Sequence, residues 1–199
     1  MSNKRKIIFD LDETLYGDSS LRERREKAIL DFLGERKKKY LRLKKDMGTI
    51  ASLNKLGIDK KVFYNIIEKV EINLKKDIKL RKIIKQLRKE FEIIVLSNVS
   101  RGLVEETLKK IGIIDLIDNY YGSDCFSQQK PALECFFMIK KEDICIGNNY
   151  EKDLEVPKNL GAITILTGKN DIRPDFCAKD IYEIEKIISK LYSKSTRYG

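Results

Sequence analysis

The chain has 199 residues, of which 42% are hydrophobic and 36% charged. A chain of this length and composition can bury the core of one domain, with or without a small accessory domain, which argues against a disordered protein. Lys and Arg outnumber Asp and Glu by 41 to 31. The resulting formal charge of +10 is compatible with binding an anionic substrate or partner.

The apolar run near the N-terminus is too short for the hydrophobic part of a secretory signal or for a membrane span. Its apolar run, Ile7–Phe9, is interrupted at Asp10, whereas a spanning helix needs about 20 apolar residues. We therefore expect a cytoplasmic protein that binds no membrane. The sequence has no histidine and its four cysteines form no CxxC pair, which argues against zinc and favours small, buried, reduced cysteines.

Strand and helix patterns follow one another along the first half of the chain. Residues 6–9 (KIIF) suit a short buried strand that ends at an acidic turn. From residue 17 to about 75, apolar residues recur at helical spacing between glycines and predict two to four helices without strands. A further helix is predicted at 79–89, followed by a strand at 92–96 (EIIVL).

The second half alternates helices with strands. The predicted order is a helix at 103–111, a strand at 120–121, a helix at 132–139, a strand at 143–146, a helix at 153–160 and a strand at 162–166. This alternation predicts an α/β fold with a doubly wound parallel sheet and right-handed crossovers. In such sheets the functional residues gather at the carboxyl ends of the strands.

Residues 22–45 hold much of the positive charge, with 11 basic and 4 acidic side chains. Three interpretations stay open: a solvated helix surface, attraction of an anionic substrate, and contact with nucleic acid. The solvated surface is the simplest of these. Nucleic acid is not the expected partner, but this segment does not exclude it.

Polar side chains able to do chemistry follow three of the predicted strands. They are Asp10, Asp12, Thr14, Ser97, Asn98 and the run 147–149 (GNN). Two carboxylates at positions i and i+2 after a strand allow one of them to attack and the other to move a proton, if a divalent cation reduces their repulsion. An acidic turn after a strand can also be purely structural, so this pair alone does not decide the function.

Four short stretches together resemble the signatures of haloacid dehalogenase (HAD) superfamily phosphatases. Residues 9–16 (FDLDETLY) look like the first signature, 96–98 (LSN) like the second, Lys130-Pro131 like the third and 147–153 (GNNYEKD) like the fourth. They occur in the order of the family along nearly the whole chain. The chain is therefore identified as a member of this superfamily.

The resemblance implies a HAD-like Rossmannoid core with a small all-α cap domain. Residues 1–16 and 79–199 would form the core, and 17–78 would form the cap, which closes over the site in the family. The TLY ending of the first signature and the stretch 76–98 resemble the nucleotidase-like branch.

The resemblance also implies the roles of individual residues. Asp10 would be the nucleophile that is transiently phosphorylated, and Asp12 would protonate the leaving alkoxide and then activate water. Lys130 would be catalytic by neutralising charge. The phosphate-binding residues would be Thr14, Ser97, Asn98 and Lys130, and the ligands of a Mg²⁺ cofactor would be Asp10, Asp12, Asn148 and Asp153. Because a halide leaves without a proton, Asp12 favours phosphatase over dehalogenase chemistry.

One position departs from the pattern of these phosphatases. Asn148 stands where they usually carry an acidic metal ligand, and an amide oxygen brings no charge to Mg²⁺. We therefore expect weaker metal affinity than is usual for the family. The alternative is a weakly active or inactive protein that binds a phosphate ligand, another protein or nucleic acid.

The expected substrates are small phosphorylated metabolites, with nucleoside monophosphates first and sugar phosphates next. The sequence determines neither the natural substrate nor the oligomeric state.

Overall fold

The computed structural model describes residues 4–193. The chain divides into two units, which we call the sheet unit (Met1–Gly17 and Leu74–Gly199) and the helical unit (Asp18–Asn73).

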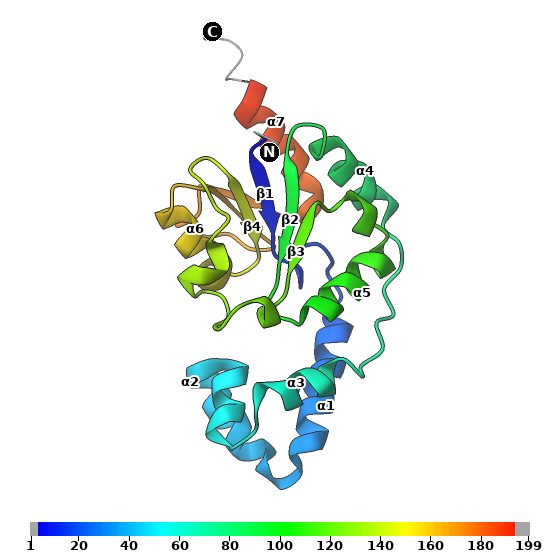
Figure 1. Cartoon of the computed structure of the whole chain (residues 1–199), viewed down its shortest axis with the longest axis vertical. Coiled ribbons are helices and arrows are strands. Elements are labelled where there is room, and N and C mark those ends of the chain that lie inside the picture. Colours follow the sequence, from blue (N-terminus) through cyan, green and yellow to red (C-terminus); the bar gives the residue numbers. More distant parts are fainter. Residues whose placement is uncertain (1–3, 194–199) are drawn as a thin grey trace. The chain divides into compact units, whose positions relative to one another are not determined.

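The sheet unit is built on six parallel strands (Figure 1). Their spatial order is β3 (Asn119–Tyr121), β2 (Glu92–Leu96), β1 (Lys6–Phe9), β4 (Ile144–Gly147), β5 (Ile163–Thr167) and β6 (Phe176–Ala178). The chain runs outward from β1 to β3 and then returns to the other side of β1 with β4. The predicted doubly wound parallel sheet is confirmed, and its order reverses at β1, where such sheets bind ligands.

Alternate residues of the central strands face opposite sides of the sheet and supply two cores. In β1, Ile7 and Phe9 pack into one apolar cluster, whereas Ile8 belongs to the other. In β2, Ile93 and Val95 join the cluster of Ile7. Both faces are therefore buried, which explains why these strands read as continuous apolar runs.

Helices cover both faces of the sheet (Figure 1). The cluster of Ile7 includes residues of α4 (Ile78–Leu87), α5 (Arg101–Ile111) and α7 (Ile184–Ser193). The other cluster includes residues of the short elements η4 (Leu133–Phe136) and η5 (Tyr150–Leu154), which precedes α6 (Glu155–Asn159). Three further 3₁₀ turns are η2 (Ile114–Leu116), η3 (Ser123–Cys125) and η6 (Ile181–Glu183).

The helical unit consists of α1 (Ser19–Leu33), η1 (Gly34–Arg36), α2 (Lys37–Lys55) and α3 (Lys60–Ile67). Its buried side chains include Leu21, Ile29, Leu33, Tyr40, Leu53 and Ile67. The basic segment 22–45 runs from α1 into α2, and its run Arg36–Lys39 is exposed. Among residues 4–193, no helix is both long and apolar enough to cross a bilayer.

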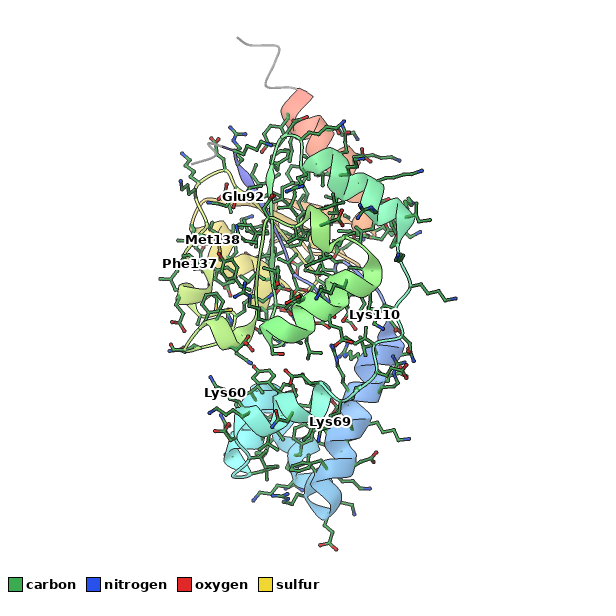
Figure 2. The ribbon with its side chains drawn as sticks, turned by 45° about the vertical axis from the view of Figure 1, so that its right-hand side comes forward. Lys60, Lys69, Glu92, Lys110, Phe137 and Met138 are labelled. Atoms are coloured by element: carbon green, nitrogen blue, oxygen red, sulfur yellow. The ribbon has the colours of Figure 1, made fainter. Side chains whose placement is uncertain are left out.

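The predicted helix at 132–139 is wrong. The segment turns through successive i to i+3 hydrogen bonds, such as Cys135 N–H to Ala132 C=O, and only η4 is regular. Phe136 and Met138 are buried, but Phe137, labelled in Figure 2, is exposed. The helical spacing of its apolar residues was therefore misleading, because they do not face one core.

Other boundaries also differ from the predictions. The predicted helix at 153–160 is split into the π-type turn η5 and the short α6. Strand β6 and helix α7 were not predicted. Strand β6 has only three residues, which are too few to show an alternation of apolar and polar side chains. Asp143 precedes β4, and its carboxylate instead accepts hydrogen bonds from the Lys6 and Lys140 N–H groups.

The four cysteines form no disulfide. Cys135 and Cys145 are buried, as expected for small apolar side chains, but Cys125 is exposed.

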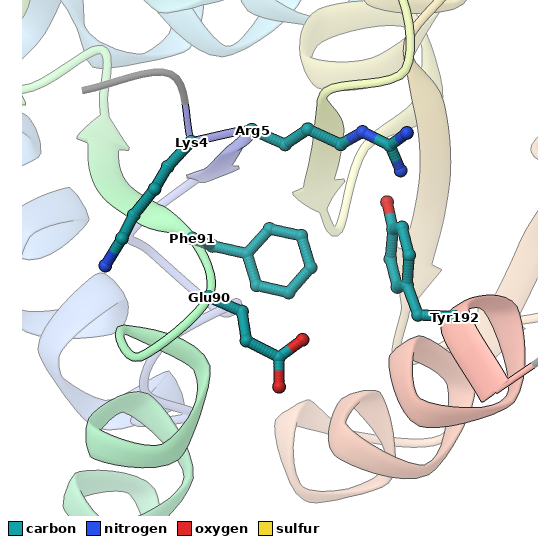
Figure 3. Close-up of a pocket in the computed structure, with 5 residues that line it drawn as sticks. All are labelled: Lys4, Arg5, Glu90, Phe91 and Tyr192. Atoms are coloured by element: carbon teal, nitrogen blue, oxygen red, sulfur yellow. The ribbon is translucent and has the colours of Figure 1, made fainter. Parts of the chain in front are cut away.

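A surface cavity of about 420 Å³ lies at the amino ends of β1 and β2 (Figure 3). Its lining residues are Lys4, Arg5, Glu90, Phe91 and Tyr192. The rings of Phe91 and Tyr192 meet edge to face with centroids 5.3 Å apart. The residues of the predicted site follow the carboxyl ends of the same strands. This cavity therefore lies at the other end of these strands.

We predict that Ile93→Ala lowers the free energy of unfolding by about 2–5 kcal/mol, because Ile93 is fully buried in a central strand. The matched control is Ile172→Ala, whose side chain is 100% exposed and which should change stability by less than about 0.5 kcal/mol. Urea unfolding of both variants measures the difference, and equal losses would contradict this assignment of the core.

Candidate active site

The predicted site residues converge at the carboxyl ends of β1, β2 and β4. Asp10 continues β1, since its N–H donates to the Ile146 carbonyl of β4 at 2.8 Å. Ser97 directly follows β2, and its N–H donates to the Tyr121 carbonyl of β3. The parallel register therefore brings together residues that are far apart in the sequence.

Lys130 lies between two carboxylates at the centre of this group. Its Nζ donates to Asp10 Oδ1 at 2.8 Å, to Asp153 Oδ1 at 2.7 Å and to the Leu96 carbonyl at 2.9 Å. The three side chains are 3%, 11% and 7% exposed for Lys130, Asp10 and Asp153, respectively. A buried ammonium with three acceptors is fully hydrogen-bonded, so its burial is compensated.

The charges of this group shift one another's pKa values. Burial and the charge of Asp153 raise the pKa of Asp10 to about 7, although Lys130 opposes the shift. Burial lowers the pKa of Lys130, but the two carboxylates outweigh burial, and the pKa ends above its ordinary value. Lys130 therefore remains a cation, and the negative charge around it exceeds its own.

Asp153 reaches Lys130 because Gly147 has no side chain. A Cβ at position 147 would lie 2.5 Å from the Cβ of Asp153, which is closer than real contacts allow. The second oxygen of Asp153 accepts the Asn149 N–H at 3.1 Å. The glycine at the end of β4 thus permits the close approach, and the following turn orients the carboxylate.

Asn98 holds the backbone of Lys130. Its Nδ2 donates to the Lys130 carbonyl at 3.1 Å, and its Oδ1 accepts the Lys130 N–H at 2.9 Å. The peptide bond between Lys130 and Pro131 is cis. The Asn98 side chain, which the sequence suggested as a phosphate ligand, therefore uses both ends of its amide to position the loop of Lys130.

Three hydroxyl groups orient the two carboxylates of the first signature. Thr14 Oγ1 donates to Asp10 Oδ2 at 2.9 Å. Tyr16 OH donates to Asp12 Oδ1, and Ser97 Oγ donates to Asp12 Oδ2 at 3.4 Å. Asp10 and Asp12 are thus held by different neighbours.

Asn148 is paired with Glu13, a residue to which the sequence reasoning gave no role. Its Nδ2 donates to Glu13 Oε2 at 3.0 Å. Glu13 has a backbone φ of 59°, which is uncommon for a residue other than glycine. A carboxylate therefore lies next to the uncharged amide that replaces the usual acidic residue.

The surplus of negative charge suits a divalent cation, since Asp10 and Asp153 share a single lysine and Asp12 lies close by. Within residues 4–193, no three or more Asp, Glu, His or Cys side chains form a group that could hold a metal. Amide and backbone oxygens can join carboxylates as ligands of Mg²⁺.

The sequence reasoning gave no role to Glu13 and Tyr16, which lie within the first signature. It named Gly147 and Asn149 only as members of the run 147–149. Their residue types give no local signal of their contacts, apart from the i to i+4 spacing of Tyr16 from Asp12.

A known protein family matches the part of the chain that holds the signatures and most of the sheet. A family model described as haloacid dehalogenase-like hydrolase matches residues 7–166. The chain belongs to the haloacid dehalogenase-like hydrolases. The match runs from β1 to β5 and includes all four signatures of this HAD hydrolase. No curated protein matches it.

Solved structures share the fold of this HAD hydrolase at low sequence identity. A HAD phosphatase from Thermococcus onnurineus is 16% identical with a TM-score of 0.68, covering 92% of this chain and 97% of its own. YfnB from Bacillus subtilis, bound to magnesium, is 14% identical with a TM-score of 0.66, covering 94% and 100%. A 2-haloacid dehalogenase from Pseudomonas syringae is 16% identical with a TM-score of 0.61, covering 94% and 99%. At such identities the likeness shows the fold alone.

We predict that Lys130→Met destabilises the protein by about 3–5 kcal/mol near neutral pH, because it leaves two buried carboxylates without their cation. Loss of the cation raises the pKa of Asp10 further, so the folded state binds protons more tightly than the unfolded state. The loss of stability should therefore be smaller near pH 5 than near pH 8.

Urea unfolding at both pH values measures this loss. The matched control is Lys158→Met, which breaks a half-exposed pair with Asp175 and should cost no more than about 1 kcal/mol. A loss that is independent of pH would contradict the assigned charges.

Proposed function

We propose that this HAD hydrolase is a Mg²⁺-dependent phosphatase that cleaves phosphate monoesters through an aspartyl-phosphate on Asp10. The observation that carries the proposal is the placement of the Asp10 carboxylate between Lys130 and Thr14 at the end of β1. An oriented carboxylate beside a buried cation suits attack on an anionic phosphoryl group.

In the first step, an oxygen of Asp10 attacks phosphorus as the bond from phosphorus to the ester oxygen breaks. Asp12 gives its proton to the leaving alkoxide. Lys130 and the Ser97 hydroxyl would offset the charge on the phosphoryl oxygens, where catalysis of this reaction class chiefly arises.

In the second step, water attacks the aspartyl-phosphate. Asp12 takes the proton of the water, inorganic phosphate leaves and the carboxylate of Asp10 is regenerated. The nearby second carboxylate favours phosphatase over dehalogenase chemistry, because a halide leaves without needing a proton.

The candidate ligands for Mg²⁺ are Asp10, Asp12, Asn148 and Asp153. We propose that the carboxylates of Asp10 and Asp153 and the amide of Asn148 would hold the ion, whereas the Asp12 carboxylate is kept for proton transfer. The ion would supply positive charge against the phosphoryl oxygens and the carboxylates. Because Asn148 contributes no charge, we expect weak affinity for the ion.

The proposed substrates are small phosphorylated metabolites in the cytoplasm, with nucleoside monophosphates before sugar phosphates. We also propose that the helical unit is the cap domain implied by the resemblance and that substrate choice depends on it. Its exposed run Arg36–Lys39 suits an anionic ligand.

We predict phosphate release from a panel of nucleotide, sugar and alkyl phosphates that requires Mg²⁺ and is lost in Asp10→Asn. The substitution keeps the shape of the side chain but removes the nucleophile, so activity should fall by at least about a thousandfold. Absence of turnover on the whole panel at high Mg²⁺ would overturn the phosphatase function and favour a binding protein.

We predict that Asn148→Asp tightens Mg²⁺ binding by about tenfold, because it adds a charged ligand. Titration calorimetry of wild type and variant with Mg²⁺ alone measures the affinity without depending on turnover. The control is Asn159→Asp, which adds the same charge at the end of α6 and should leave the affinity unchanged. Unaltered affinity in Asn148→Asp would remove residue 148 from the metal site.

A further inference from the structure

We infer that Tyr16 is a positioning residue for proton transfer, and that it holds one oxygen of Asp12 so that the other oxygen faces the reacting phosphoryl group. This inference rests on the proposed function and adds to it a residue with no assigned role.

The two oxygens of Asp12 have different neighbours. Oδ1 accepts a hydrogen bond from Tyr16 OH, whereas Oδ2 accepts one from the Ser97 hydroxyl at 3.4 Å. Ser97 is the proposed phosphoryl ligand, so Oδ2 is the oxygen on the side of the reaction. Tyr16 thus engages the oxygen that does not meet the substrate.

Tyr16 is itself held firmly in place. Its side chain packs against the main apolar cluster of the sheet unit, and its backbone forms a bridge with Asp12. The turn between them is closed by hydrogen bonds from the Thr14 and Leu15 N–H groups to the Leu11 carbonyl. A tyrosine side chain has few rotamers to lose, so its hydroxyl is a well-defined anchor.

The chemistry of Asp12 requires such an anchor. In the first step its proton must go from the carboxyl group to the ester oxygen, and in the second step the same group must take a proton from water. A carboxyl group that rotates presents either oxygen, with or without the proton, and is less often in the reactive position. With Oδ1 bound to Tyr16, the same oxygen, Oδ2, serves both transfers.

The role of Tyr16 can be tested through the leaving group of the substrate. An alkoxide needs a proton to leave, whereas p-nitrophenolate leaves without one. The parameter to compare is kcat/KM, which covers the steps up to departure of the leaving group. Damage to proton transfer therefore lowers kcat/KM for an alkyl phosphate much more than for p-nitrophenyl phosphate.

We predict that Tyr16→Phe lowers kcat/KM for an alkyl phosphate by about ten- to hundredfold and for p-nitrophenyl phosphate by less than about threefold. The substitution keeps the aromatic ring and hence the packing. The matched control is Tyr182→Phe, which removes a hydroxyl that donates to the Asp77 carboxylate at 2.5 Å outside the site. This control should change neither value.

A double substitution makes the test independent of packing. When Asp12→Asn has already removed the proton donor, adding Tyr16→Phe should cause no further loss with the alkyl phosphate. An additive loss would mean that Tyr16 acts elsewhere.

The outcomes separate this inference from the proposed function. If the wild-type protein is active and Tyr16→Phe affects both esters equally, or neither, the role of Tyr16 is overturned while the phosphatase function stands. If the wild-type protein hydrolyses neither ester, the proposed function is overturned, and the role of Tyr16 with it.

Discussion

The contact on which the site depends is the one that Lys130 makes with Asp10 and Asp153. It joins three segments that are distant in the sequence: the end of β1, the loop before η4 and the turn η5 after β4. None of these charges could be buried alone without a large desolvation cost. Together they form a hydrogen-bonded group whose negative charge exceeds its positive charge, which suits both a cation and an attacking carboxylate.

The surroundings of this ion group keep its members in register. Asn98 holds the loop of Lys130 from the end of β2, and Gly147 lets Asp153 approach from the end of β4. Gly147 ends β4 and Asn98 follows β2, and these two strands flank β1, where the order of the sheet reverses. The register of the strands therefore sets the relative positions of the charged residues, and a shift in register would separate these charges.

Asn148 stands where related phosphatases usually carry an acidic residue, and its neighbour Glu13 changes what that difference means for the charge of the site. The Asn148 amide donates a hydrogen bond to the Glu13 carboxylate. Glu13 therefore supplies, in contact with residue 148, the negative charge that an acidic residue at 148 would carry. This arrangement leaves the site rich in negative charge while changing which atoms can contact a metal. The arrangement is therefore compatible with the proposed phosphatase chemistry at a site of low affinity for Mg²⁺.

Much of the fold could be predicted because both faces of the central strands are buried. Continuous apolar runs such as 92–96 are typical of strands between two layers of helices, and the structure assigns that strand the same limits. The segment 132–139 was misread because its apolar residues have helical spacing but do not face one core. Strand β6 was missed because three residues are too few for a pattern.

The sequence by itself determined the fold class and the chemical groups of the candidate site, because acidic and hydroxyl side chains directly follow apolar strands and, with Lys130, occur in the order of the family signatures. Only the tertiary structure decided what each group contacts. Tyr16 on Asp12, Glu13 on Asn148 and Asn98 on the backbone of Lys130 are hydrogen bonds. Two of them join residues more than thirty positions apart. Such contacts depend on strand register and loop path to within a fraction of an ångström, and no local pattern of residues encodes them.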